Sequence, residues 1–99
     1  MKKKNFEPFI SGNKVIVDLD AKIDILVDVD VYIVSKNSKP LYCFDDSDNA
    51  IFFALLIYLD CNSCSFLVSI FYSLIRYFSQ VNDLLTIVSV RQRLNSEVM

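Results

Sequence analysis

The chain is short and apolar: of its 99 residues 54% are hydrophobic, the net charge is −2, and there are one glycine, two prolines and no histidine. A chain of this length is expected to form one small domain, residues 1–99, and to bury only part of its apolar surface by itself. The composition excludes low-complexity disorder and a glycine-rich phosphate loop. Without histidine the chain also lacks the usual neutral-pH general base and the commonest transition-metal ligand.

The charges are unevenly distributed along the chain. Residues 18–60 contain nine aspartates and only three lysines. An acidic region of this kind attracts cations or basic protein surfaces and repels nucleic acid. We therefore expect a basic protein partner and no direct contact with nucleic acid, the alternative being a solvated sheet face whose charge serves solubility.

Residues 1–12 are predicted to form an N-terminal arm that ends in a turn at Gly12-Asn13. From Val15 to Ile33 every odd-numbered residue is then apolar. The even-numbered positions in this run carry five aspartates: Asp18, Asp20, Asp24, Asp28 and Asp30. Alternation with a period of two places apolar side chains on one face of an extended chain and the carboxylates on the other. The run predicts strand with an acidic outer face.

The alternating run is too long for one strand of a small domain. A break at Asp20-Ala21-Lys22 is favoured, because a three-residue loop keeps the odd positions on the core side. In that register Leu19 faces Ile23, Val17 faces Ile25 and Val15 faces Val27, all toward the core. On the outer face, Asp18 lies across from Asp24 and Lys14 from Asp28. A bulged continuous strand is the alternative.

The rest of the chain predicts one short strand followed by two helices. Residues 35–40 form a polar loop, and a strand follows at 41–44. Asp45, Asp46 and Asp48 are N-cap residues, and their charge suits the start of a helix over about 48–59. A second helix is predicted over about 63–80, capped by Asn62 or Ser63 and carrying a stripe of small residues. The β-branched segment 84–90 predicts a returning strand, with helix as the alternative, and residues 94–99 a polar tail.

These elements together predict an α+β fold. An antiparallel sheet from about 14 to 44, with 84–90 as a candidate further strand, is packed on its apolar face by the two helices at about 48–59 and 63–80. The acidic face stays exposed. Burying an apolar side chain stabilises by roughly 1.5–3 kcal/mol. Aspartate in a strand costs at most about 1 kcal/mol. The sheet therefore forms despite its carboxylates.

No motif in the chain indicates a reaction. Cys61-Asn62-Ser63-Cys64 has C-x-x-C spacing, but the surrounding residues do not support a redox motif, and only Cys43 remains as a further thiol ligand for zinc. Asp45, Asp46 and Asp48 lack the glycine and terminal glutamate of a calcium loop. We expect no enzyme activity, no cofactor and no metal site. Three cysteines without a visible secretory signal favour the cytoplasm.

Residues 50–75 are long enough to cross a bilayer and contain only Asp60 as a charged residue. That charge and the neighbouring capping residues interrupt the stretch, so association with a membrane is the less favoured reading.

The function most consistent with these features is non-catalytic binding. A small cytoplasmic inhibitor fits: an immunity protein or antitoxin that covers the phosphate-binding surface of a nuclease or another nucleic-acid-processing enzyme. The expected partner contacts are the aspartates of the alternating run and of the following helix cap, namely Asp18, Asp20, Asp24, Asp28, Asp30, Asp45, Asp46 and Asp48. The alternatives are a homo-oligomeric structural or accessory protein, dimeric through its apolar helices, and a membrane-associated helical hairpin.

Overall fold

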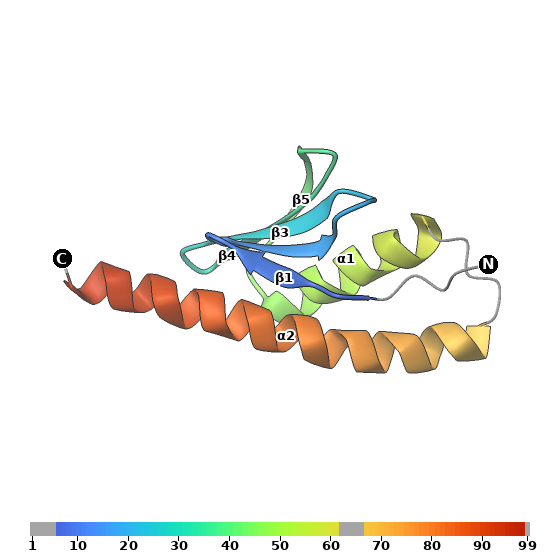
Figure 1. The fold of residues 1–99 in the computed structure, drawn as a ribbon. Helices are drawn as coiled ribbons and strands as arrows, with labels where there is room; N and C mark the ends of the chain where they lie inside the picture. The colour runs from blue at the N-terminus through green and yellow to red at the C-terminus, as the bar shows by residue number, and fades with distance from the viewer. Residues whose placement is uncertain (1–5, 62–66, 99) are drawn as a thin grey trace.

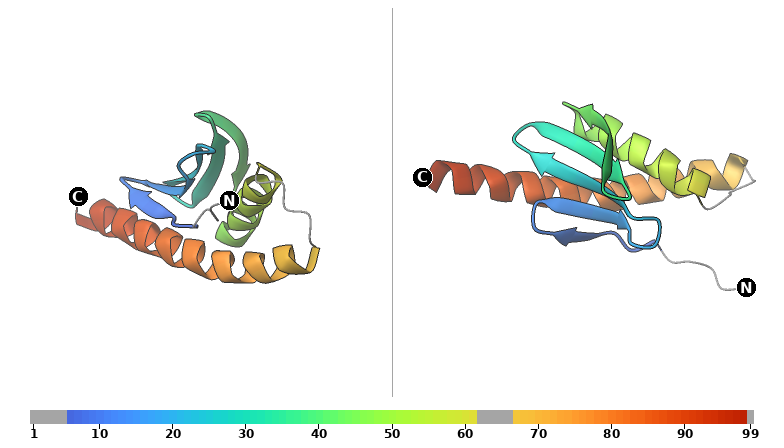
Figure 2. Two further views of the ribbon diagram at one scale, coloured as in Figure 1. Left: turned by 45° about the vertical axis from the view of Figure 1, so that its right-hand side comes forward. Right: turned by 90° about the horizontal axis from the view of Figure 1, so that it is seen from above.

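The computed structural model describes residues 6–61 and 67–98 and has the α+β fold that the sequence predicts. Five strands form an antiparallel sheet in the order β1-β2-β3-β4-β5. Their bounds are β1 Phe9–Ser11, β2 Lys14–Asp18, β3 Ile23–Asp28, β4 Val31–Lys36 and β5 Lys39–Phe44. Helices α1, Ser47–Cys61, and α2, Leu67–Val98, both lie against one face of this sheet (Figure 1). Neither of the described helices covers the other face of the sheet (Figure 2).

Strands β2 and β3 form the centre of the core, as the alternation predicts. Their fully buried side chains come from odd-numbered positions: Val15, Val17, Ile23, Ile25 and Val27. Removing each of these side chains from water stabilises the fold by roughly 1.5–3 kcal/mol. This burial fixes which face of the two strands meets the helices, because a slip of one residue would move all of these side chains to solvent.

The pairing of β2 with β3 differs from the predicted register. Val15 lies opposite Ile25, and Ile16 lies opposite Asp24, with a bulge between Ile16 and Asp18. All the predicted facing pairs were therefore wrong, namely Leu19–Ile23, Val17–Ile25, Val15–Val27, Asp18–Asp24 and Lys14–Asp28. Leu19 was also assigned wrongly to the core, since it lies in the turn and is 67% exposed. The bulge and a turn longer than the predicted three residues change which residues of β2 and β3 lie opposite each other.

The β3–β4 turn reverses the alternation. Asp28 pairs with Val31, so the turn has only two residues, Val29 and Asp30. A turn of two residues places the next odd-numbered position on the opposite face. In β4 the even-numbered Val34 is therefore fully buried, opposite Ile25. The predicted core position Ile33 lies on the outer face, across from Leu26.

The start of helix α1 confirms the predicted capping. Its first residue is Ser47, and the Asp46 Oδ2 atom accepts a hydrogen bond from the Asn49 backbone N–H at 3.3 Å. Along the helix, Ala50, Ile51, Ala54 and Leu55 are fully buried against the sheet and α2. The opposite side of α1 is open, because Phe52 and Leu56 are nearly half exposed.

Helix α2 is much longer than the helix predicted over 63–80. It continues to Val98, so the predicted strand at 84–90 was wrong and the helical alternative is confirmed. The buried residues Val81, Leu85 and Val88 follow one another at spacings of four and three, the helical period. Packing of this stripe outweighs the β-propensity of the β-branched side chains around it. Residues 94–98 of the predicted polar tail are also helical.

The segment before the sheet also packs on the helices. Residues 9–11 of the predicted arm form β1, which pairs with β2. Ahead of it, the Phe6 ring stacks on Tyr77 of α2 with centroids 4.0 Å apart and meets the edge of Tyr58 of α1 at 5.2 Å. Phe6 thus links the two helices. The predicted cap at Asn62 or Ser63, and Cys64 of the C-x-x-C spacing, lie outside the described residues.

Candidate interaction surface

The structure places seven of the eight predicted aspartate contacts at the two ends of the sheet and Asp24 between them. Only Asp24 and Asp28 lie on the outer face of the ladder, opposite Ile16 and Val31. The outer face is therefore mixed rather than a continuous acidic surface. The remaining aspartates of the alternating run lie at turns, where this residue type is favoured because its short side chain hydrogen-bonds to nearby backbone.

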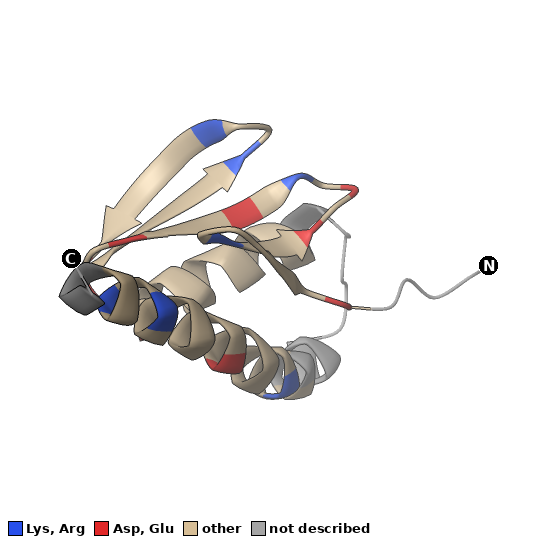
Figure 3. Ribbon diagram, turned by 60° about the vertical axis from the view of Figure 1, so that its left-hand side comes forward, with Lys and Arg blue, Asp and Glu red and all other residues tan. Residues whose placement is uncertain are grey.

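Asp18 serves the β2–β3 turn. Its side chain is buried, and its Oδ2 atom accepts a hydrogen bond from the Ala21 backbone N–H at 2.7 Å. Asp20 lies exposed in the same turn. The neighbouring β4–β5 turn contacts this one, since the Asn37 N–H donates to the Lys22 carbonyl oxygen at 2.9 Å. We call the two turns and their flanking residues, which include Lys22, Lys36 and Lys39, the lysine end of the sheet (Figure 3).

Asp24 lies between the two ends, half-buried on the outer face. Burial raises the pKa of this carboxyl above its usual value, and the nearby Lys14 ammonium partly opposes the shift. Lys14 reaches it along the diagonal of the ladder, because Lys14 pairs with Leu26 and Ile16 pairs with Asp24. Asp24 is half-buried and already lies near Lys14 of the same chain, so it should attract a basic partner less strongly than an exposed carboxylate would.

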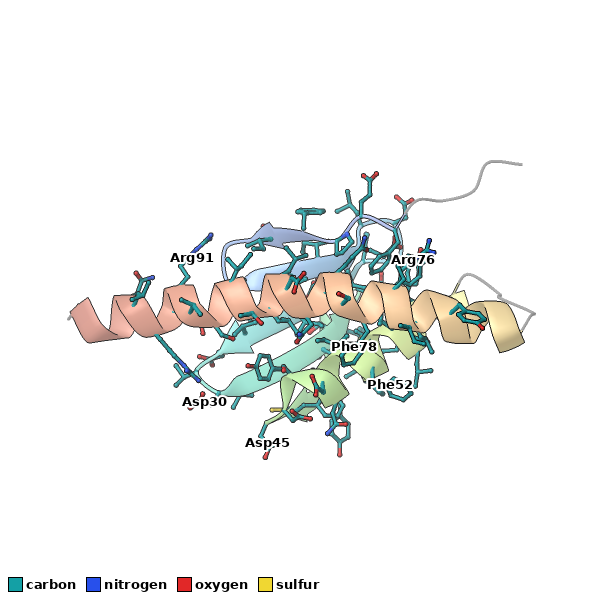
Figure 4. The ribbon with its side chains drawn as sticks, turned by 90° about the horizontal axis from the view of Figure 1, so that it is seen from below. Asp30, Asp45, Phe52, Arg76, Phe78 and Arg91 are labelled. Carbon is teal, nitrogen blue, oxygen red and sulfur yellow. The ribbon has the colours of Figure 1, made fainter. Side chains whose placement is uncertain are left out.

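The opposite end of the sheet gathers five exposed aspartates, which we call the acidic end: Asp28, Asp30, Asp45, Asp46 and Asp48. Strand β3 ends there, β4 begins there, and the chain leaves β5 there to enter α1. The pairing of Tyr32 with Phe44 places Asp45 beside the start of β4. Figure 4 shows Asp30 and Asp45 at this same end. The sheet thus brings together two acidic segments that are separate in the sequence.

Helix α2 supplies the polar contacts next to the acidic end. An Arg93 guanidinium nitrogen lies 3.8 Å from an Asp30 carboxylate oxygen, with both side chains more than three-quarters exposed. An exposed pair at this distance contributes at most about 1 kcal/mol and is screened by salt. The ion pair therefore leaves Asp30 able to exchange Arg93 for the cation of a partner.

Two side chains fix the position of α2 beside this end. The Gln92 amide nitrogen donates a hydrogen bond to the Val27 carbonyl oxygen, and the Tyr32 hydroxyl lies 3.3 Å from the Ser89 hydroxyl. Two hollows lie around these contacts, of about 90 and 190 Å³. Ordinary small-molecule pockets are larger, at roughly 300–1,000 Å³. Sequence reasoning missed the two α2 residues because it predicted a strand over 84–90, which includes Ser89, and no helix or strand at Gln92.

A separate apolar groove lies between the helices. It measures about 380 Å³ and is lined by Phe52, Leu74, Ile75 and Phe78. Figure 4 shows Phe52 and Phe78 on neighbouring helices at this groove. None of these four described residues has a polar side chain that would orient a substrate.

Neither a metal cluster nor a membrane span is present in the described part of the chain. Among residues 6–61 and 67–98, no group of three or more Cys, Asp and Glu side chains is placed to hold a metal ion. In the same residues, neither helix has an apolar stretch long enough to cross a bilayer.

Comparisons of the chain with protein-family models, with curated proteins and with solved structures find no match.

Proposed function

We propose that the chain is a non-catalytic binding protein whose acidic end docks on a basic surface of a protein partner. The observation that carries this proposal is the convergence of five exposed aspartates from the β3–β4 turn and the β5–α1 junction. Among the described residues, the exposed Arg93 forms an ion pair with one member of this cluster, Asp30. A surface of this kind speeds and orients the approach of a positively charged partner.

The structural setting of the aspartates supports binding of a folded partner. Asp28 is the last residue of β3, and Asp46 is held as the cap of α1. Carboxylates on rigid elements lose little conformational freedom when they bind, so more of the attraction appears as affinity. A flexible acidic tail would lack this advantage.

The partner class that this surface suits is a nucleic-acid-processing enzyme. Such an enzyme presents lysine and arginine side chains to phosphate groups, and the acidic end offers carboxylates to the same side chains. The proposed role is that of an immunity protein, antitoxin or related inhibitor in the cytoplasm, which excludes nucleic acid from the partner. No step of this role needs a cofactor or a reacting group on the chain.

The test compares two double variants with the same change in net charge. Asp28→Asn/Asp45→Asn removes charge from the acidic end, whereas Glu7→Gln/Asp20→Asn removes it from exposed sites elsewhere. The partner is captured from native lysate with the wild type and identified, and its Kd is measured against salt concentration. We expect the first variant to weaken binding about tenfold at low salt and to flatten the salt dependence. The second variant should bind like the wild type.

Inhibition is measured separately, as loss of the partner's activity on nucleic acid when the chain is titrated in. Equal weakening by both double variants would contradict the proposal, because the effect would then follow net charge alone. Capture of a partner with an acidic contact surface would contradict it as well.

A further inference from the structure

One face of α2 points away from the rest of the molecule. We define its outer stripe as the exposed residues that lie opposite the buried Val81, Leu85 and Val88, namely Tyr72, Arg76, Ser79, Asp83, Ile87, Val90 and Leu94. They follow one another at spacings of three and four, so they share one side of the helix. Figure 1 shows that the sheet and α1 lie above α2 and that none of the other described elements lies against its lower side.

The outer stripe is unusually apolar for a surface that meets only water. Tyr72 is 69% exposed, Val90 50% and Ile87 46%. Side chains of this size arranged along one helix face are typical of a surface that packs on another protein.

The two charges of the outer stripe are placed symmetrically. Arg76 and Asp83 lie on either side of Ser79 and Gln80, at equal distances along the chain. They are seven residues apart, about 10 Å along a helix, which is too far for the pairing of side chains three or four residues apart. Neither charge therefore neutralises the other within one chain.

We propose that a second copy of this chain binds the outer stripe, with the two α2 helices antiparallel and crossing at Ser79–Gln80. In this two-fold arrangement Arg76 of each copy faces Asp83 of its partner, which forms two equivalent ion pairs. The same register brings Tyr72 of each copy against the partner's Ile87. Ser79, a small side chain, lies at the crossing and lets the two helices approach closely.

Charge complementarity favours a second copy of the chain as the partner and an antiparallel orientation of the two α2 helices. A parallel pair of α2 helices would place Arg76 against Arg76 and Asp83 against Asp83, which is unfavourable. The antiparallel pair satisfies both charges with no residue from another protein. The outer stripe shares no residue with the acidic end, so the dimer does not use the aspartates proposed to bind the partner.

The experiment reverses each charge of the pair in the full-length chain under reducing conditions. The molecular mass is measured by sedimentation velocity over a range of concentrations and compared with the chain mass of 11.4 kDa. We expect the wild type to form a dimer and either Arg76→Glu or Asp83→Lys to weaken self-association roughly tenfold, because each change makes two repulsive pairs. Both positions are exposed, and helix content by circular dichroism should be unchanged.

Mixing the two single variants provides the decisive result. A heterodimer of Arg76→Glu with Asp83→Lys has one pair of Glu with Lys and one pair of Arg with Asp, both attractive. We expect the mixture, and also the double variant Arg76→Glu/Asp83→Lys alone, to recover the dimer. The control Arg91→Glu reverses an exposed charge of α2 outside the outer stripe and should associate like the wild type.

Three results would overturn the inference. The first is a wild type that stays monomeric at every concentration, and the second is a dimer that neither single reversal weakens. The third is a failure of the mixed variants to associate, which would place any dimer interface in another register or on another surface, such as the groove at Phe52 and Phe78.

Discussion

The two ends of the sheet use the same residue type in different ways. At the lysine end the Asp18 carboxylate is buried and accepts a backbone hydrogen bond within its own turn. At the acidic end Asp28, Asp45 and Asp48 are exposed. An aspartate whose carboxylate is tied to the backbone contributes to folding, whereas an exposed one contributes charge to the surface. The difference separates residues whose substitution should change stability from residues whose substitution should change binding.

The largest expected effect on stability is at Asp18. In Asp18→Ala the Ala21 N–H loses its acceptor beside the core, so we expect unfolding to become easier by about 2 kcal/mol. Urea denaturation of this variant and of Asp28→Ala measures the contrast between the two ends. Asp28→Ala should stay within about 0.5 kcal/mol of the wild type. If both variants lost the same free energy of unfolding, the aspartates of the two ends would not differ in their contribution to stability.

A smaller effect is expected at Asp46, which belongs to the acidic end but caps α1. Asp46→Ala removes the acceptor of the Asn49 N–H and should cost about 1 kcal/mol. Asp46→Ser keeps a capping oxygen and should recover most of that loss. Asp45→Ala is the control, because it removes a neighbouring aspartate that is not the acceptor of this cap hydrogen bond. Thermal denaturation of the three variants tests this. If Asp45→Ala were as destabilising as Asp46→Ala, capping would not be the cause.

The smallest effect is expected at Asp24, and it depends on pH. Because burial raises the pKa of this carboxyl in the folded state, ionisation costs folding stability as the pH rises through that pKa. Asp24→Asn should therefore be slightly more stable than the wild type at pH 7, by less than about 0.5 kcal/mol. The advantage should vanish below the unfolded value of 3.8, where the wild-type carboxyl is also neutral.

Urea denaturation at pH 7 and at pH 3 provides the comparison for Asp24. Asp28→Asn is the control on the same face of the sheet, where the side chain is exposed. A gain for Asp24→Asn that stayed the same at both pH values would contradict a cause in ionisation.

Several parts of the fold follow from local sequence pattern. The alternation around Val15 and Ile25 predicted the buried face of β2 and β3, and the aspartates before Ser47 predicted the start of α1. Both are short-range signals, since alternation reports one face of a strand and a cap hydrogen-bonds within a single turn. The prediction of a continuous acidic face was wrong, because the alternating pattern did not show that Asp18, Asp20 and Asp30 would lie at turns.

The fold class, the core of β2 and β3, and the acidity of the central part of the chain all follow from local patterns in the amino-acid sequence. Which aspartates meet depends on the tertiary structure. The two-residue turn at Val29-Asp30 reversed the faces of β4, and pairing of Tyr32 with Phe44 brought the β5–α1 junction to the β3–β4 turn. Tertiary packing also makes residues 84–90 helical, because their buried stripe packs on the core. Turn length and contacts between distant segments depend on the packing of the whole chain, which a local pattern does not contain.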